Sequence, residues 1–290
     1  MRPRPFEYYA PSSLAEALSL LSKTEDAKIL AGGQSLLSLM KLRLAAPNSL
    51  IDINHVTELN YIRAKNDWIT IGALTRHDQL ALSDLVREKC TLLAEAASAI
   101  ADQQVRNRGS IGGSLAHADP SADLPTACVA LKAEIEVAKE NGTRTIAAKD
   151  FFLDFFTTAL EEDEIIKEVR IPIPPPRSGG AYAKVTKGHN DFGLVAVAAQ
   201  CSVNLDDACE DISVVLGGFA SKPTHAAEAE RTLARQKVDA QIVREAASKA
   251  TEGMTPTPDP RASSALKREM IRTLTERTLT KAIDRAREAF

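Results

Sequence analysis

Two glycine-rich segments constrain this chain more than any other feature of its sequence. They read Ala31-Gly32-Gly33-Gln34-Ser35 and Ser110-Ile111-Gly112-Gly113-Ser114. Glycine allows φ > 0 and lets a ligand approach the main chain closely, and successive N–H groups in such a turn form a concave anion site. Two of these turns predict one long diphosphate ligand better than one small anion. The alternative for each segment is a tight turn that binds nothing.

The side chains beside both turns strengthen the diphosphate hypothesis. Gln34 and Ser35 add donors at the first turn, and a helix that starts at Leu36 would direct partial positive charge toward the same place. Ser110 supplies a hydroxyl at the second turn. Neither segment fits G-x-G-x-x-G or G-x-x-x-x-G-K-[ST], so the sequence excludes the usual Rossmann and P-loop interpretations.

The charge and hydropathy of the chain exclude two classes of partner. The 290 residues carry a formal net charge of −3, whereas a nucleic-acid partner would favour a basic face. No apolar run approaches the roughly 18 residues that span a bilayer. Met1-Arg2-Pro3-Arg4-Pro5 has no apolar stretch behind it, so we expect no signal peptide and a cytoplasmic location.

The cysteines indicate that the chain itself holds no metal. Cys90, Cys128, Cys201 and Cys209 form no C-x-x-C or C-x-x-x-x-C pattern. Because iron–sulfur and structural zinc sites need closely spaced thiolates, we expect four buried, reduced thiols. A metal centre that works with this chain would then belong to a different polypeptide.

Hydrophobic periodicity predicts an α+β protein in three parts, residues 1–55, 56–176 and 177–290. The first is a small βα lobe, in which Ser13 and Glu16 form a capping box before a helix. The other expected elements of this lobe are a strand at 28–31 that runs into the first glycine turn, a helix at 36–43 and a strand at 50–53.

The second lobe and the C-terminal part follow from similar patterns. The second lobe is expected to contain strands at 68–71 and 165–171, a helix at 94–101, and a hairpin of 134–138 and 143–147 joined by Asn141-Gly142. Four aromatic residues, Phe151, Phe152, Phe155 and Phe156, are expected in its core. A linker at Pro172 to Gly180 then precedes strands at 181–185, 195–203 and 212–216 and helices at 224–236, 239–251 and 264–288.

The polar residues after the second turn do not form a catalytic set. Asp119 fits either a sugar diol or a turn before Pro120, and Asp123 fits either sugar hydroxyls or a helix cap. We expect His117 to be structural or to line a ligand, because no nucleophile is paired with a base. A protein that binds a large cofactor without such a set leaves the chemistry to the cofactor.

Four segments closely resemble the FAD-binding medium subunit of molybdenum hydroxylases, the family of bacterial carbon monoxide dehydrogenase medium subunits and of the FAD domain of xanthine dehydrogenase. The segments are 31–36, 107–116, 119–125, and 182–185 followed by Asp191-Phe192-Gly193. The resemblance covers essentially the whole chain. It implies a two-lobed FAD-binding domain of the vanillyl-alcohol-oxidase-like (PCMH) type, followed by a C-terminal domain with a three-stranded antiparallel sheet and helices.

The resemblance also implies a set of cofactor-binding residues. The two turns would hold the diphosphate, Asp123 would lie near ribityl or ribose hydroxyls, Ile166 would contact the flavin or adenine side, and Lys184 would reach the flavin. The full set is Ala31, Gly32, Gly33, Gln34, Ser35, Leu36, Ser110, Ile111, Gly112, Gly113, Ser114, Asp123, Ile166 and Lys184. The chain departs from the family pattern at two places. The family often has Asn at the position of Ser114, and many relatives have a more basic segment at 187–190.

The implied function is electron transfer through non-covalently bound FAD. Electrons would come from [2Fe–2S] clusters of a small subunit, which receive them from a molybdopterin-containing large subunit, and would leave to an external acceptor. The expected assembly is a dimer of heterotrimers. The alternatives are a stand-alone FAD-dependent reductase of the same fold and a nucleotide-binding regulator. The substrate, which meets the large subunit, could be an aldehyde, a purine, an N-heteroaromatic or carbon monoxide.

Overall fold

The computed structural model describes residues 2–188 and 190–289. Its first lobe is a parallel sheet in the order β1-β3-β2, built from β1 (Glu7–Tyr9), β3 (Ser49–Asp52) and β2 (Ala27–Leu30). Helix α1 (Leu14–Lys23) follows β1, and α2 (Leu36–Leu42) follows β2. Every predicted element of this lobe is present, and β1 is an additional strand.

Ser13 caps α1 as predicted, because its hydroxyl accepts from the N–H of Glu16 at 3.2 Å. The reciprocal half of the capping box differs from the prediction. The Glu16 carboxylate accepts from the N–H of Ser12 at 2.8 Å, one residue before the cap. The helix start is therefore fixed by two bonds, as in a capping box, but with a shifted partner.

An antiparallel sheet of five strands in the order β4-β5-β10-β6-β7 forms the second lobe. The predicted hairpin is β6 (Glu134–Lys139) and β7 (Gly142–Ala147). The other strands are β4 (Ile62–Lys65), β5 (Trp68–Gly72) and β10 (Ile165–Pro172). Short helices lie beside it: α3 (His77–Leu82), α4 (Asp84–Lys89), α5 (Thr91–Ser98), α6 (Gln103–Arg106), α7 (Ile111–His117), α8 (Asp123–Ala130) and α9 (Ala148–Phe151). Two 3₁₀ turns, η1 (Ile53–His55) and η2 (Thr57–Leu59), connect the lobes.

The phenylalanine prediction holds for only half of its residues. Phe151 and Phe152 are buried, whereas Phe155 is 46% exposed and Phe156 57% exposed. The exposed pair lies at the tip of a two-stranded hairpin, β8 (Phe152–Asp154) and β9 (Thr157–Thr158), which is too small to cover them. The ring of Phe156 lies instead against His117, with ring centroids 5.2 Å apart.

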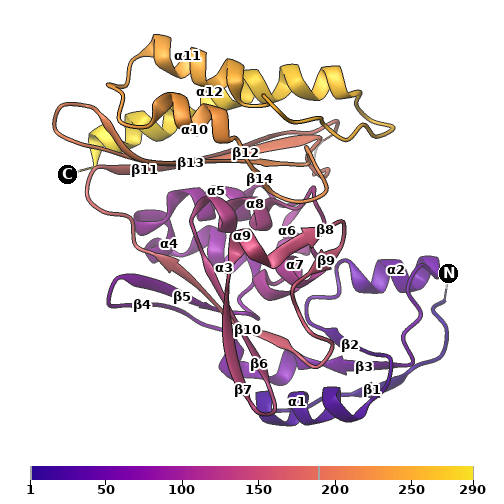
Figure 1. Cartoon of the computed structure of the whole chain (residues 1–290). Coiled ribbons are helices and arrows are strands. Elements are labelled where there is room, and N and C mark those ends of the chain that lie inside the picture. The colour runs from indigo at the N-terminus through magenta and orange to yellow at the C-terminus, as the bar shows by residue number, and fades with distance from the viewer. Residues whose placement is uncertain (1, 189, 290) are drawn as a thin grey trace.

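The C-terminal part carries an antiparallel sheet in the order β11-β12-β13-β14. The three predicted strands are β11 (Ser178–Val185), β12 (Val195–Val203) and β13 (Cys209–Gly217), and the two-residue β14 (Thr224–His225) adds a fourth. Three helices, α10 (Ala227–Leu233), α11 (Ala240–Lys249) and α12 (Ser264–Glu288), lie above this sheet in Figure 1, and α5 and α8 lie below it.

The position of this sheet between two layers explains the apolar run in β12. Ala196 and Ala198 pack into the core of the second lobe, whereas Val195, Val197 and Ala199 pack against the C-terminal helices. A strand that is buried on both faces needs no polar alternation. The layered arrangement also places β11 next to helix α5 of the second lobe, so that the third part of the chain can contribute to a site in the second (Figure 1).

All four cysteines are buried and free, as expected from their spacing. Across residues 2–188 and 190–289, no helix has the length and apolar character needed to cross a membrane.

Candidate functional site

The first glycine segment lies between the carboxyl end of β2 and the start of α2. Gly33 has φ +72, a conformation that L side chains rarely adopt. Among the hydrogen bonds of the described residues, the main-chain N–H groups from Gly32 to Leu36 have no acceptor. The hydroxyl of Ser35 makes no cap bond to α2. This segment therefore offers a row of unpaired donors, which suits an anionic group.

The second glycine segment is not a turn, which corrects the expectation from the sequence. Ile111 to Ser114 form the first turn of α7, with Ser110 at the N-cap. The N–H groups of Ile111 and Gly112 donate to the carbonyls of Thr75 and Ala73, at 3.0 and 2.9 Å. Those of Gly113 and Ser114 donate to the hydroxyl and carbonyl of Ser110. The donors left for a ligand here are therefore mainly the hydroxyls of Ser110 and Ser114.

Gly112 of the second segment and Gly109, the residue directly before that segment, instead permit close packing. A Cβ at Gly112 would lie 2.6 Å from the Cβ of Ala73, and one at Gly109 would lie 2.6 Å from the ring of His77. Burial, with help from Arg76 and Arg106, lowers the pKa of His77 to about 4, so the ring against Gly109 is neutral at pH 7. Without side chains at these positions, α7 can lie directly on the loop that follows β5.

The structure brings the two glycine segments side by side, although about 80 residues separate them in sequence. A Cβ at Gly32 would lie 2.3 Å from the carbonyl oxygen of Arg108 and 2.7 Å from the Cα of Gly109. A Cβ at Gly113 would lie 3.8 Å from the Cβ of Ala31. Only a residue without a side chain fits at Gly32, so main chain from both lobes can contact one extended ligand.

A second group of predicted residues forms a buried polar cluster between α8 and β11. Asp123, at the start of α8, is 4% exposed. Its carboxylate accepts from the hydroxyl of Tyr182 at 2.6 Å and lies 3.0 Å from the ammonium of Lys184. Burial raises the pKa of Asp123, whereas Lys184 and Tyr182 oppose that rise. Asp123 is not a helix cap, because Ala122 holds the N-cap position.

Tyr182 is the member of this cluster that the sequence did not identify as a site residue. It lies two positions before Lys184 in β11, so both side chains point to the same face of the sheet. Burial and the neighbouring Asp123 carboxylate raise the pKa of its phenol well above the usual value. It is therefore a hydrogen-bond donor to Asp123 at any physiological pH.

The remaining candidates belong to neither of these two groups. Ile166 is buried in β10, in the core of the second lobe. His117 packs on Phe156, and burial lowers its pKa, so it is neutral at pH 7. Asp119 accepts from the N–H of Ser121 at 2.8 Å, as its interpretation as a turn residue requires. In the variable segment 187–190, His189 lies outside the described residues.

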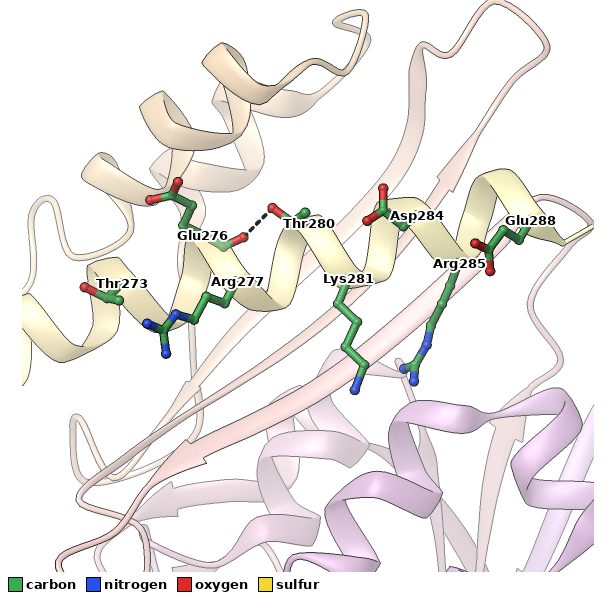
Figure 2. Close-up of a pocket in the computed structure, with 8 residues that line it drawn as sticks. All are labelled: Thr273, Glu276, Arg277, Thr280, Lys281, Asp284, Arg285 and Glu288. Carbon is green, nitrogen blue, oxygen red and sulfur yellow. Dashed lines mark hydrogen bonds between the residues drawn. The ribbon is translucent and has the colours of Figure 1, made fainter.

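A hollow of about 690 Å³ lies elsewhere, along one side of α12 (Figure 2). Its eight lining residues all belong to this one helix, so it is open to solvent. Lys281 and Arg285 point toward the lower layer of the structure, where their charged groups contact Glu95 of α5 at 2.6 and 2.7 Å. These pairs attach α12 to the second lobe and do not involve the candidate site.

Comparison with known proteins identifies this arrangement. Residues 4–174 match the family described as the FAD binding domain in molybdopterin dehydrogenase. The chain belongs to this family. Residues 180–282 match the CO dehydrogenase flavoprotein C-terminal domain. The chain is thus a FAD subunit of the molybdenum hydroxylase family, and the two-lobed FAD-binding fold expected from the sequence is confirmed.

Individual relatives agree over nearly the full length of the chain. The 6-hydroxypseudooxynicotine dehydrogenase complex subunit alpha of Paenarthrobacter nicotinovorans is 38% identical, across 99% of this chain and 97% of that protein. A carbon monoxide dehydrogenase structure from Hydrogenophaga pseudoflava superimposes with a TM-score of 0.94 at 39% identity, covering 98% and 99% of the two chains. The structure of quinoline 2-oxidoreductase from Pseudomonas putida 86 superimposes with a TM-score of 0.93 at 33% identity, covering 99% of each chain.

Proposed function

We propose that this chain binds one FAD non-covalently and relays electrons from [2Fe–2S] clusters of a partner subunit to an external acceptor. The observation that carries the proposal is the contact between Gly32 and the Arg108–Gly109 main chain, which leads directly into the second glycine segment. The unpaired N–H groups from Gly32 to Leu36 lie at the same place. When bound, the flavin supplies the chemistry of accepting and releasing electrons.

The residues of the chain bind and orient the cofactor. Ala31 to Leu36 would hold the diphosphate through main-chain N–H groups and the side chains of Gln34 and Ser35, and the hydroxyls of Ser110 and Ser114 would contact it from the second lobe. Asp123 would accept a hydrogen bond from a sugar hydroxyl, and Ile166 would supply an apolar contact. Lys184 would place a positive charge beside the flavin, at a position fixed by its ion pair with Asp123.

The proposed partners are a small [2Fe–2S] subunit and a large molybdopterin subunit, assembled as a dimer of heterotrimers. The names of relatives support the assembly in part, because they include a complex subunit alpha and the medium chain of carbon monoxide dehydrogenase. The alternative is a stand-alone FAD-dependent reductase of the same fold. The cytoplasmic location stays a prediction from the sequence.

Acid denaturation tests the cofactor directly. We expect the purified chain to release one equivalent of FAD into the supernatant, because the site consists of N–H groups, hydroxyls and an ion pair. Chromatography of the released flavin distinguishes FAD from FMN. Release of FMN, the absence of flavin, or flavin retained in the protein pellet would each contradict the proposal.

Replacing Lys184 by methionine is expected to lower the reduction potential of bound FAD. Loss of the cation removes an attraction for the negative charge that reduction adds, and leaves the buried Asp123 carboxylate with its hydrogen bond from Tyr182 but without the ion pair. A lowering of about 30 mV would correspond to 1.4 kcal/mol for a two-electron couple. This lowering of the potential should grow with pH. At low pH the buried Asp123 of the variant takes up a proton, which offsets the positive charge lost with Lys184.

The control for this variant is Lys132→Met. Lys132 also pairs with a carboxylate, that of Asp211 at 2.6 Å, but on the exposed surface of the protein. Potentials are measured for both FAD-loaded variants by equilibration with redox dyes at several pH values. A Lys184→Met potential equal to that of the control at every pH would show that Lys184 does not act on the flavin.

A further inference from the structure

Arg76 lies between the two glycine segments and contacts residues from both lobes. Its Nη1 donates to the carbonyl oxygen of Arg108 at 2.9 Å, and its Nη2 donates to the side-chain oxygen of Asn54 at 2.7 Å. Asn54 in turn donates from Nδ2 to the carbonyl oxygen of Ala31 at 2.8 Å. These three bonds, here called the Arg76 bridge, run from Ala31, the first residue of the first segment, to Arg108, two residues before the second.

The bridge meets the glycine contact at a single atom. The Arg108 carbonyl oxygen that accepts from Arg76 is also the atom that a Cβ at Gly32 would approach within 2.3 Å. The carbonyl of Ala31, at the other end of the bridge, belongs to the residue directly before Gly32. The guanidinium therefore fixes both sides of the place where the two segments touch.

Each member of the bridge is itself held in position. The N–H of Arg76 donates to the side chain of Gln79 at 2.7 Å, at the start of α3. The N–H of Asn54 donates to Asp52 at 2.9 Å, and Asp52 also accepts from the hydroxyl of Tyr8 at 2.7 Å. Side chains supported in this way lose little freedom when a ligand binds.

We propose that Arg76 is a positioning residue that sets the spacing of the two glycine segments for the FAD diphosphate. The inference rests on the proposed function, since it assumes that the diphosphate lies against both segments. The planar guanidinium can direct two N–H groups to two acceptors in fixed directions, whereas a lysine ammonium is a point charge on a flexible stem. The spacing should therefore depend on arginine itself rather than on a positive charge.

The test measures FAD affinity for the full-length apoprotein carrying Arg76→Met, Arg76→Lys, Asn54→Ala, or Arg76→Met with Asn54→Ala. We expect each single variant to bind FAD about tenfold more weakly or worse. The double variant should have the same FAD affinity as Arg76→Met, because both changes break the same bridge. Arg63→Met is the matched control, since the guanidinium of Arg63 stacks on the ring of Tyr61 and takes no part in the Arg76 bridge. It should bind FAD normally.

Two further readouts separate positioning from general loss of structure. Affinity for ADP, which carries the diphosphate, should fall in the bridge variants, whereas affinity for riboflavin, which lacks it, should not change. If Arg76→Met fails to fold, the milder Asn54→Ala carries the same test. Equal losses for ADP and riboflavin would overturn the proposal, and so would normal FAD affinity in Arg76→Lys, which would indicate a role of charge alone.

A Gly33→Val variant distinguishes failure of this inference from failure of the proposed function. If Gly33→Val loses FAD while the bridge variants bind it normally, the diphosphate site is supported and the Arg76 bridge is rejected. If Gly33→Val itself binds FAD and ADP normally, the diphosphate does not lie at the glycine segments, and this rejects both its proposed placement there and the role of the Arg76 bridge.

Discussion

Replacing Gly33 by valine is expected to leave the chain without FAD. Gly33 has φ +72, and a Cβ there would lie 2.9 Å from Cδ1 of Leu37. The left-handed conformation costs a non-glycine residue about 1–2 kcal/mol, and branching at Cβ adds to the strain. Relief of that strain would turn the unpaired N–H groups of the segment away from one another. We expect FAD affinity to fall by about 100-fold or more, equal to roughly 2.7 kcal/mol.

Gly253→Val is the matched control for this experiment. Gly253 also has φ +72, but a Cβ there would meet nothing within 4 Å. The two variants therefore carry a similar backbone penalty, and only one lies at the proposed site. Flavin content per chain is measured for both, with thermal unfolding as a check of folding. A Gly33→Val chain with the flavin content of Gly253→Val would contradict the assignment of the first segment.

Gly112→Val would be a poorer test of the same idea. The valine side chain would collide with Ala73, because even the Cβ atom added at position 112 would lie 2.6 Å from the Cβ of Ala73. Overpacking of this kind typically costs about 1–3 kcal/mol of folding stability. Loss of flavin in that variant could therefore follow from a damaged interface between α7 and the loop after β5.

Local patterns in the sequence predict most of the strands. The Asn141-Gly142 pair gives the β6–β7 hairpin, and the apolar run at 195–203 gives β12. The failures occur where tertiary packing decides the outcome. Gly112 and Gly113 are poor helix formers, yet they lie in the first turn of α7, where Ala73 and Thr75 accept from the N–H groups of Gly112 and Ile111 and Ser110 caps the helix.

The site could be predicted residue by residue but not as an arrangement. Motif resemblance identifies Asp123 and Lys184 separately, whereas their 3.0 Å ion pair joins positions 61 residues apart and depends on β11 lying beside α8. Arg76 and Asn54 belong to none of the four resembling segments. Their contribution follows from two lobes meeting at Gly32, which no local pattern in the sequence indicates.

The second large effect concerns the partners of the chain. Under the proposed function, the chain alone should hold FAD but should not oxidise a hydroxylase substrate, because oxidation occurs in the large subunit. Electrons from that reaction should reach the flavin only when the small and large subunits are both present. The expected difference is a reaction that is either present or absent, rather than a graded change in rate.

Anaerobic flavin reduction measures this most directly. The FAD-loaded chain, free of molybdenum and iron by metal analysis, is mixed with a panel of aldehydes, purines and N-heteroaromatics and with carbon monoxide, and its absorbance near 450 nm is followed. The same panel is then applied to the complex purified with its partners. We predict no bleaching for the chain alone and rapid bleaching of the complex by one class of substrate. Bleaching and steady turnover by the metal-free chain would contradict the electron-relay account.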